Sequence, residues 1–222
     1  AEIAHIKRMS TVGRKNDALV TRHETTKQKY QEEKIDGVVC RLEDVLVSVD
    51  RLLKNAFYYT SKKYQDKEMY DDELEKIKYL DYRRFYEGNA EAITYFESYF
   101  NDNLSQITAL HNVKQFYATL FKHDYNIVVY TKYSKEFAEY VLALLKISRF
   151  VSIIIDKELS ENQLETALES IKNSKNPLLI SNLKEDIIEA NKKRVLTCST
   201  NDKNDTTYKI NRFTDLDNII IV

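Results

Sequence analysis

The stretch that decides the fold is 38-VVCRLEDVLVSVD-50. A short apolar run ends at Cys40, and an arginine, Arg41, and two acids, Glu43 and Asp44, follow almost at once. A short continuous apolar run with a polar boundary is typical of a strand that is buried in a parallel sheet. The charged residues therefore predict either a catalytic site at the end of this strand or side chains that have replaced one.

Further along the chain, short apolar runs alternate with stretches of helical periodicity. Strand-like runs lie at residues 126–130, 151–155, 177–180 and 194–198, with a last apolar run at 218–222. Apolar residues at spacings of three and four predict helices over residues 104–120, from Ser134 onward, and over 160–172 and 183–192. This alternation predicts an α/β fold, with a Rossmann-like parallel sheet that carries helices on both faces.

Residues 50–101 interrupt the alternation directly after the first strand. Their pattern is helical, and they contain nine of the sixteen tyrosines. We predict an α-helical cap at 50–101, inserted into a core made of residues 35–49 and 102–222. Residues 1–34 hold eight Lys or Arg against five Asp or Glu and are predicted to form a basic N-terminal arm.

Composition excludes several classes of protein. The net charge of −1 gives no long-range attraction to nucleic acid or to an anionic membrane, and no apolar run is long enough to be a transmembrane segment. The four histidines show no metal-ligand spacing, so we expect no metal and no cofactor. Cys40 and Cys198 lie in or beside strand-like runs, which predicts buried free thiols.

Polar side chains follow each predicted strand. Because ligands of open α/β sheets bind at the carboxyl ends of the strands, residues that follow different strands are expected to meet there. The candidates are Arg41, Glu43 and Asp44 after the first strand, Thr131 after the second, Lys157 after the third, and Asn182 and Asp186 after the fourth.

These positions resemble, in chain order, the four motifs of the haloacid dehalogenase-like (HAD) superfamily of phosphatases and phosphotransferases, over residues 35–222. The family's first motif, Asp-x-Asp-Gly after a strand, reads here 41-RLED-44. The second motif, a Ser or Thr that ends a strand, corresponds to Thr131, and the third, a Lys before a helix, to Lys157. The fourth, Gly-Asp with another Asp four residues on, reads 181-SNLKED-186.

The resemblance also implies a chemistry. In the family the first Asp attacks phosphorus, the second is the general acid and base, and Mg²⁺ is held by the first Asp and the acids of the fourth motif. Here Arg41 stands at the nucleophile position, and a guanidinium stays protonated in proteins. The other departures and matches are Glu43 for the second Asp, Asp44 for Gly, Asn182 for an acid, and unchanged Thr131, Lys157 and Asp186.

We therefore predict a degenerate site without a catalytic residue, in which Arg41 and Lys157 face Glu43 and Asp186 as paired charges. On this interpretation the chain is an inactive pseudoenzyme, an accessory structural subunit of a larger mitochondrial complex such as a respiratory-chain or ATP synthase complex. Two alternatives stay open: a phosphate- or nucleotide-binding sensor, and an active Mg-dependent phosphatase with rewired chemistry at Glu43 or Asp44. If the location is not mitochondrial, it is cytoplasmic.

The stretch 79-YLDYRRFYEG-88 suggests a partner surface, because tyrosine and arginine are enriched at protein interfaces. The expected partners are protein subunits; the same aromatic residues would equally suit the insert's own small core. Many acids in the insert argue against nucleic acid, while contact of residues 1–34 with ribosomal RNA stays open. The interface candidates are Tyr79, Tyr82, Arg83, Arg84, Phe85 and Tyr86.

Overall fold

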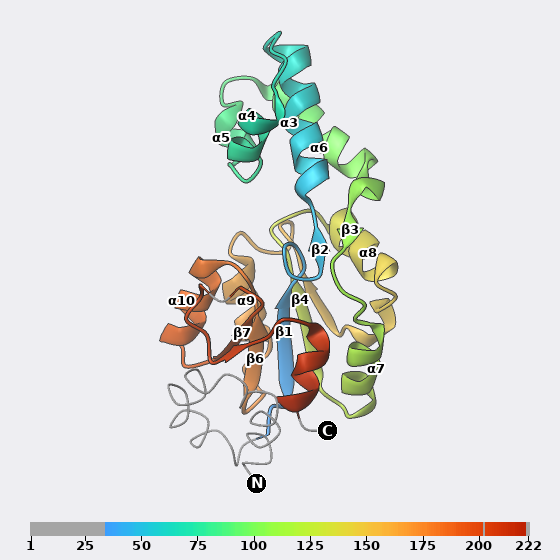
Figure 1. Cartoon of the computed structure of the whole chain (residues 1–222), viewed down its shortest axis with the longest axis vertical. Helices are drawn as coiled ribbons and strands as arrows, with labels where there is room; N and C mark the ends of the chain where they lie inside the picture. Colours follow the sequence, from blue (N-terminus) through green and yellow to red (C-terminus); the bar gives the residue numbers. More distant parts are fainter. Residues whose placement is uncertain (1–33, 202, 221–222) are drawn as a thin grey trace. The chain divides into compact units, whose positions relative to one another are not determined.

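The computed structural model describes residues 34–201 and 203–220 (Figure 1). The chain forms two compact units. The first, the core unit, contains the described residues up to Leu46 together with those from His111 onward; the second, the insert unit, is Val47–Leu110. The predicted basic arm, apart from Lys34, lies outside the described residues.

A parallel sheet forms the centre of the core unit. Its strand order is β5-β4-β1-β6-β7-β8, and every neighbouring pair is parallel. Strand β1, the apolar run of the opening stretch, pairs on one side with β4 and on the other with β6, so it is buried along its whole length. The strands are β1 (Gly37–Arg41), β4 (Asn126–Tyr130), β5 (Ile153–Ile155), β6 (Pro177–Ile180), β7 (Leu196–Ser199) and β8 (Tyr208–Lys209).

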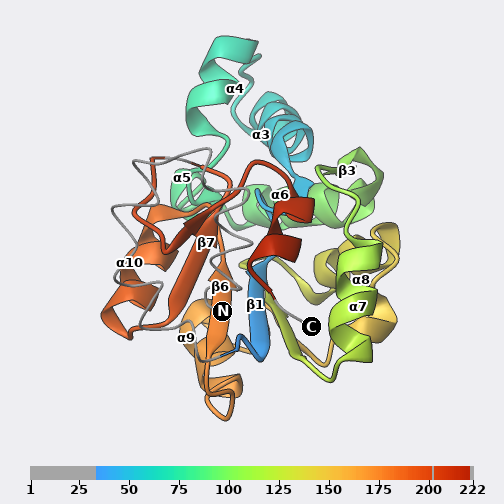
Figure 2. The same cartoon turned by 60° about the horizontal axis from the view of Figure 1, so that its bottom comes forward.

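Helices cover both faces of this sheet, as the alternating pattern predicted (Figures 1 and 2). Side chains of a strand alternate between faces, so Val39, Val128 and Leu179 point to the same side, where they pack against α9 and α10. On the opposite face Cys40 contacts Tyr117 of α7. The helices are α7 (Lys114–Lys122), α8 (Lys135–Leu144), α9 (Gln163–Ser170) and α10 (Lys184–Lys192), with 3₁₀ turns η2 (Ser148–Phe150) and η3 (Phe213–Asn218).

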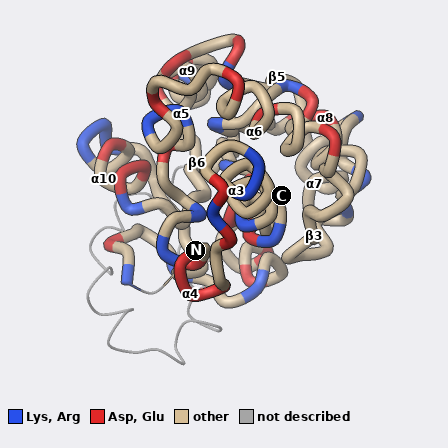
Figure 3. Tube along the Cα trace, turned by 90° about the horizontal axis from the view of Figure 1, so that it is seen from above, with Lys and Arg blue, Asp and Glu red and all other residues tan. Residues whose placement is uncertain are grey.

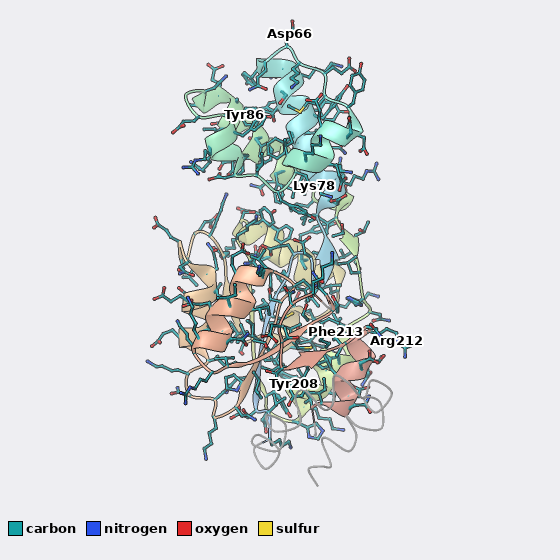
Figure 4. The ribbon with its side chains drawn as sticks, turned by 60° about the vertical axis from the view of Figure 1, so that its left-hand side comes forward. Asp66, Lys78, Tyr86, Tyr208, Arg212 and Phe213 are labelled. Carbon is teal, nitrogen blue, oxygen red and sulfur yellow. The ribbon has the colours of Figure 1, made fainter. Side chains whose placement is uncertain are left out.

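Two further contacts fix the core unit locally. A Cβ atom added at Gly37 would lie 2.7 Å from Ser174 Oγ and 2.8 Å from Ile171 Cδ1, so a larger residue at the start of β1 would force these side chains to shift. Phe213 of η3 packs edge-on against Phe116, with ring centroids 5.5 Å apart (Figure 4). Cys40 and Cys198 are buried free thiols, as predicted.

The insert unit follows β1 in the chain and is built mainly from helices, as predicted. Strands β2 (Val47–Ser48) and β3 (Thr108–Ala109) pair antiparallel at its two chain ends. The acidic first turn of α4 and the mixed charges of α10 in the core unit are visible in Figure 3. The helices of the insert unit are α3 (Asp50–Tyr64), α4 (Asp71–Ile77), α5 (Tyr82–Phe85) and α6 (Ala90–Asp102), with the 3₁₀ turn η1 (Leu104–Gln106).

One predicted helix is wrong. Residues 104–120 contain η1, the strand β3 and a helix, α7, that begins only at Lys114. Residues 108–109 must be extended because they pair with 47–48, and this long-range pairing overrides the local periodicity. Among the described residues, no helix is both long enough and apolar enough to cross a membrane.

Candidate functional site

The predicted site residues gather where three central strands end. Arg41 is the last residue of β1, Thr131 directly follows β4, and Ser181 directly follows β6. Asp186 lies in the first turn of α10, which starts three residues after Ser181. Because the three strands are parallel neighbours, their carboxyl ends bring these side chains to the same edge of the sheet.

Arg41 binds two carboxylates at once. Its Nε donates to Asp186 Oδ2 at 2.7 Å and its Nη2 donates to Asp186 Oδ1 at 3.3 Å, which makes the contact two-pronged. Its Nη1 donates to Glu43 Oε2 at 2.8 Å. Arg41, Glu43 and Asp186 are only 8%, 1% and 4% exposed. One cation and two anions are therefore paired in a nearly closed environment, as a buried charge requires.

Asp186 is held by further donors. Its Oδ2 also accepts from the Tyr130 hydroxyl at 2.6 Å and from Ser181 Oγ at 2.9 Å. The Arg41 guanidinium carbon lies 5.0 Å from the centre of the Tyr130 ring, within range of a cation–π contact. Both oxygens of this carboxylate are thus engaged by protein groups, and the dipole of α10 favours a negative charge at this position.

The surroundings of Arg41 and Tyr130 keep both side chains protonated. Burial opposes the charge on the guanidinium, but Glu43, followed by Tyr130 and Asp186, outweighs it and raises the pKa of Arg41 above its ordinary value. Burial, and then the carboxylate of Asp186, raise the pKa of the Tyr130 phenol well above its usual range. Arg41 is therefore a permanent cation and Tyr130 a permanent hydrogen-bond donor near neutral pH.

Glu43 contains a polar atom that the described residues leave unsatisfied. Its Oε2 accepts from Arg41 and from the backbone N–H of Lys132 at 3.0 Å. Its Oε1 is buried and has no hydrogen-bond partner within the described part of the chain. A buried oxygen without a partner costs about 1–3 kcal/mol, and more when it is charged. This atom therefore calls for a ligand or a water molecule.

Thr131 presents a second polar group at the same edge. The residue is fully buried, and its Oγ1 accepts from the backbone N–H of Tyr133 at 3.1 Å. Within the part of the chain that the structure describes, its hydroxyl hydrogen has no assigned acceptor. The Thr131 hydroxyl is therefore able to donate a hydrogen bond to an anion.

Arg41, and not Lys157, is the cation that binds the two carboxylates. The side chain of Lys157 is exposed, and neither Glu43 nor Asp186 accepts a hydrogen bond from it. The prediction that Arg41 and Lys157 jointly face both carboxylates is wrong in this respect, because the forked guanidinium alone reaches both. The backbone N–H of Lys157 donates to the Tyr133 carbonyl at 3.0 Å, which ties its loop to the loop after β4.

Asn182 joins the loops after two strands by bonding to the backbone of Asp44, and it does not bond to Arg41. Asn182 Nδ2 donates to the Asp44 carbonyl and to Thr200 Oγ1, both at 2.8 Å, while its Oδ1 accepts from the backbone N–H of Thr200 at 2.9 Å. It does not cap α10, whose N-cap residue is Leu183. Asp44 has a φ of 64°, a left-handed conformation that suits the glycine of the family motif and that aspartate tolerates.

The family's Mg²⁺ does not fit these residues. Magnesium takes oxygen ligands in a near-ideal octahedron. Here a guanidinium lies between the two carboxylates and donates to both, and the described residues contain no group of three or more His, Cys, Asp or Glu arranged for a metal. The Mg-dependent form of the phosphatase alternative therefore lacks its ligand set, and we assign no step to the ion.

Tyr130 is a site residue that sequence reasoning missed. As the last residue of an apolar strand it looks like an ordinary core aromatic. The register pairs it directly with Arg41, which puts both side chains on the face of α10. Knowledge of the strand order would have revealed it, since the pairing of β1 with β4 is what brings the phenol to Asp186.

The interface candidates divide into two groups. Tyr82, Phe85 and Tyr86 pack inside the insert unit, where Tyr82 stacks on Phe96 with ring centroids 4.3 Å apart, and Phe85 and Tyr86 contact Phe57. Tyr86 is labelled in Figure 4. Tyr86 is 2% exposed, so it belongs to the insert's own core. The candidates with exposed side chains are Tyr79, Arg83 and Arg84.

Comparison with solved structures identifies the fold. A protein from Clostridium difficile, provisionally assigned as a phosphatase, aligns with a TM-score of 0.70 at 17% identity, over 85% of this chain and 100% of that one. CbbY from Rhodobacter sphaeroides, solved with phosphate, gives 0.67 at 11%, over 83% and 97%. A HAD-superfamily hydrolase of subfamily IA from Geobacter sulfurreducens gives 0.62 at 12%, over 80% and 92%. The chain has the haloacid dehalogenase-like fold, as its motifs predicted. No protein-family model and no curated protein matches it.

This comparison corrects the functional prediction. Most of the similar structures are described as phosphatases or hydrolases, and they give no support to the predicted inactive pseudoenzyme. The expectation of a structural accessory subunit in a mitochondrial respiratory-chain or ATP synthase complex is overturned with it. The prediction had equated the absence of a first-motif carboxylate with the absence of activity, although Glu43 and Thr131 keep polar groups in the buried site.

Proposed function

We propose that the protein is a phosphomonoesterase that transfers the phosphoryl group directly to water, without a phosphoaspartate intermediate. The observation that carries this proposal is the buried Oε1 of Glu43, which has no partner among the described residues. A carboxylate with one oxygen anchored and the other available is suited to act as a general base on a water molecule. The first-motif nucleophile is absent because Arg41 occupies its position.

The phosphoryl group would be held by donors at the strand ends. A guanidinium has five N–H groups, and the hydrogen bonds of Arg41 to Glu43 and Asp186 use three of them, so two remain. Thr131 supplies its hydroxyl hydrogen. Lys132, directly after Thr131, adds a second positive charge near the strand ends, which favours a phosphate anion.

The chemical step then balances without a further reactant. The oxygen of the water molecule forms a bond to phosphorus while Glu43 takes a proton from that water. The bond between phosphorus and the ester oxygen breaks, and the leaving oxygen takes its proton from bulk water. The products are an alcohol and inorganic phosphate, after which Glu43 releases its proton to solvent.

A decisive experiment measures phosphate release from a panel of phosphomonoesters in the presence of a chelator. The Glu43→Gln variant keeps an oxygen that can accept from Arg41 but loses the base, so its rate should fall about 10²- to 10⁴-fold. Glu136→Gln, at an exposed position in the first turn of α8, is the matched control and should keep the wild-type rate. Wild-type protein without measurable release, or a Glu43→Gln variant with full activity, would refute the proposal.

A second candidate function is phosphate or nucleotide binding without turnover. It is favoured by the three hydrogen bonds that hold Arg41 rigidly, because a fixed cation suits recognition as well as catalysis. Stabilisation of the wild-type protein by inorganic phosphate, combined with no release from any ester, would select this candidate. A mitochondrial location and protein partners at Tyr79, Arg83 and Arg84 stay predictions, testable by fractionation and cross-linking.

A further inference from the structure

We infer that Arg41 is a built-in replacement for a divalent cation, so that the site handles phosphate in a metal-excluded form and becomes a metal site once the guanidinium is exchanged for a carboxylate. This inference deepens the proposed function and rests on it for the role of phosphate. Its metal part stands on the geometry of Arg41, Glu43 and Asp186 alone.

The positive charge of Arg41 lies between two carboxylates. The guanidinium joins two carboxylates that belong to different elements, Glu43 just after β1 and Asp186 in α10, through contacts of 2.8 and 2.7 Å. Two anions at one buried place need a cation, since burial without one costs several kcal/mol per ion. Arg41 supplies that cation from within the chain, which is the role that a bound ion would otherwise have.

Of the four carboxylate oxygens of Glu43 and Asp186, only Glu43 Oε1 has no hydrogen-bond donor among the described residues, and one oxygen is not a ligand set for a metal ion. Magnesium needs carboxylate oxygens at about 2.0–2.1 Å. Asp186 Oδ2 already accepts from Arg41, Tyr130 and Ser181, and Glu43 Oε2 accepts from Arg41 and Lys132. A metal ion would have to displace these donors and lie beside a like charge. The closed pairing therefore excludes the ion.

The positive charge of Arg41, unlike that of a bound metal ion, cannot leave the site. Glu43, Tyr130 and Asp186 raise the pKa of Arg41 above its ordinary value although burial opposes the charge, so the cation persists across the physiological range. A metal-dependent site, in contrast, changes charge when the ion leaves. Phosphate binding to this protein should therefore depend on neither chelator nor added Mg²⁺.

One substitution should reverse this property. Arg41→Asp removes the internal cation and adds a third carboxylate next to Glu43 and Asp186. Three carboxylates on two neighbouring elements form a ligand set that hard divalent cations prefer. The variant should be destabilised without metal, because three buried anions repel one another, and stabilised by metal through binding to the folded state.

The experiment follows free Mn²⁺ by electron paramagnetic resonance at neutral pH, with wild type, Arg41→Asp and the control Arg149→Asp. Arg149 is an exposed arginine of the same unit. Wild type and control should leave the free signal unchanged, whereas Arg41→Asp should remove one equivalent, with affinity at least about tenfold above wild type. A thermal-shift series with Mg²⁺ should stabilise Arg41→Asp alone.

The outcomes separate this inference from the proposed function. Stoichiometric binding of Mn²⁺ by wild type, or an Arg41→Asp variant that folds and binds no more than the control, would overturn the inference. If Arg41→Asp does not fold, Arg41→Asn replaces it, and the wild-type titration decides without any variant. Absence of ester hydrolysis, with the predicted Mn²⁺ pattern, would remove the phosphatase proposal and leave the cation replacement intact.

Discussion

Removing Arg41 should lower the free energy of unfolding much more than removing an exposed arginine. Arg41→Ala deletes three hydrogen bonds and leaves Glu43 and Asp186, 1% and 4% exposed, without their counter-charge. Loss of one partner from a buried ion pair typically costs about 3–5 kcal/mol, because the other charge stays buried and uncompensated. Since a domain's whole stability is about 5–15 kcal/mol, the expected loss is a large part of it.

The assay is equilibrium unfolding in urea, with Arg83→Ala as the matched control. Arg83 binds Glu97 at 2.8 Å, the distance of the Arg41–Glu43 contact, but its side chain is 63% exposed. An exposed pair contributes at most about 1 kcal/mol. Arg41→Met combined with Glu43→Gln and Asp186→Asn should recover part of the loss, because no buried charge is then left alone. Equal effects of Arg41→Ala and Arg83→Ala would refute this reasoning.

Three further predictions test the surroundings of the site. Tyr130→Phe removes the donor to Asp186 and should lower the free energy of unfolding by about 1.5–3 kcal/mol, whereas Tyr140→Phe, on α8, should change it little; urea midpoints compare the two. Gly37→Ala forces a Cβ against Ser174 and Ile171 and should cost about 1–3 kcal/mol by thermal melting, and a neutral effect would show that α9 can move away. Burial raises the pKa of Cys40 to about 12, while an unfolded thiol ionises near about 8.5. The buried thiol therefore stabilises the fold fully below about pH 8.5, and this stabilisation falls by up to about 1.4 kcal/mol per pH unit as the pH rises toward about 12. Cys40→Ala should flatten the plot of unfolding free energy against pH in this range, and an unchanged plot would contradict the burial argument.

The fold was predictable because each central strand is a continuous apolar run. The runs at 126–130 and 177–180 coincide with β4 and β6, and the charged end of the first run at Arg41 is the end of β1. Buried parallel strands need apolar side chains on both faces, whereas a strand with one face in water alternates apolar and polar residues. A continuous apolar run therefore indicates the buried parallel strand. The order in which the strands pair was not visible in the sequence.

Local periodicity failed where distant residues decide the conformation. The apolar stripe over 104–120 is divided because 108–109 pair with 47–48, a contact that no short window of sequence contains. Likewise Asn182, expected at the site after the fourth strand, instead bonds with Asp44 and Thr200. In both cases the partner lies far along the chain, and it determines the outcome.

The candidate site was predictable to the level of residues and not to the level of contacts. Parallel strands bring their carboxyl ends to one edge, so Arg41, Thr131 and Asp186 were found from strand ends alone. Which cation binds the carboxylates depends on side-chain reach: Arg41 spans both, while Lys157 stays exposed. Tyr130 became a site residue only through its register with Arg41.

In this protein a guanidinium is inferred to take the place of a metal ion between Glu43 and Asp186. The most direct test is a crystal structure of the wild-type protein soaked with Mn²⁺ and inorganic phosphate, with anomalous scattering used to locate manganese. We expect phosphate near the hydroxyl of Thr131 and the remaining N–H groups of Arg41, and no anomalous peak between the two carboxylates. A manganese peak bound to Asp186, with Arg41 turned away, would contradict this inference.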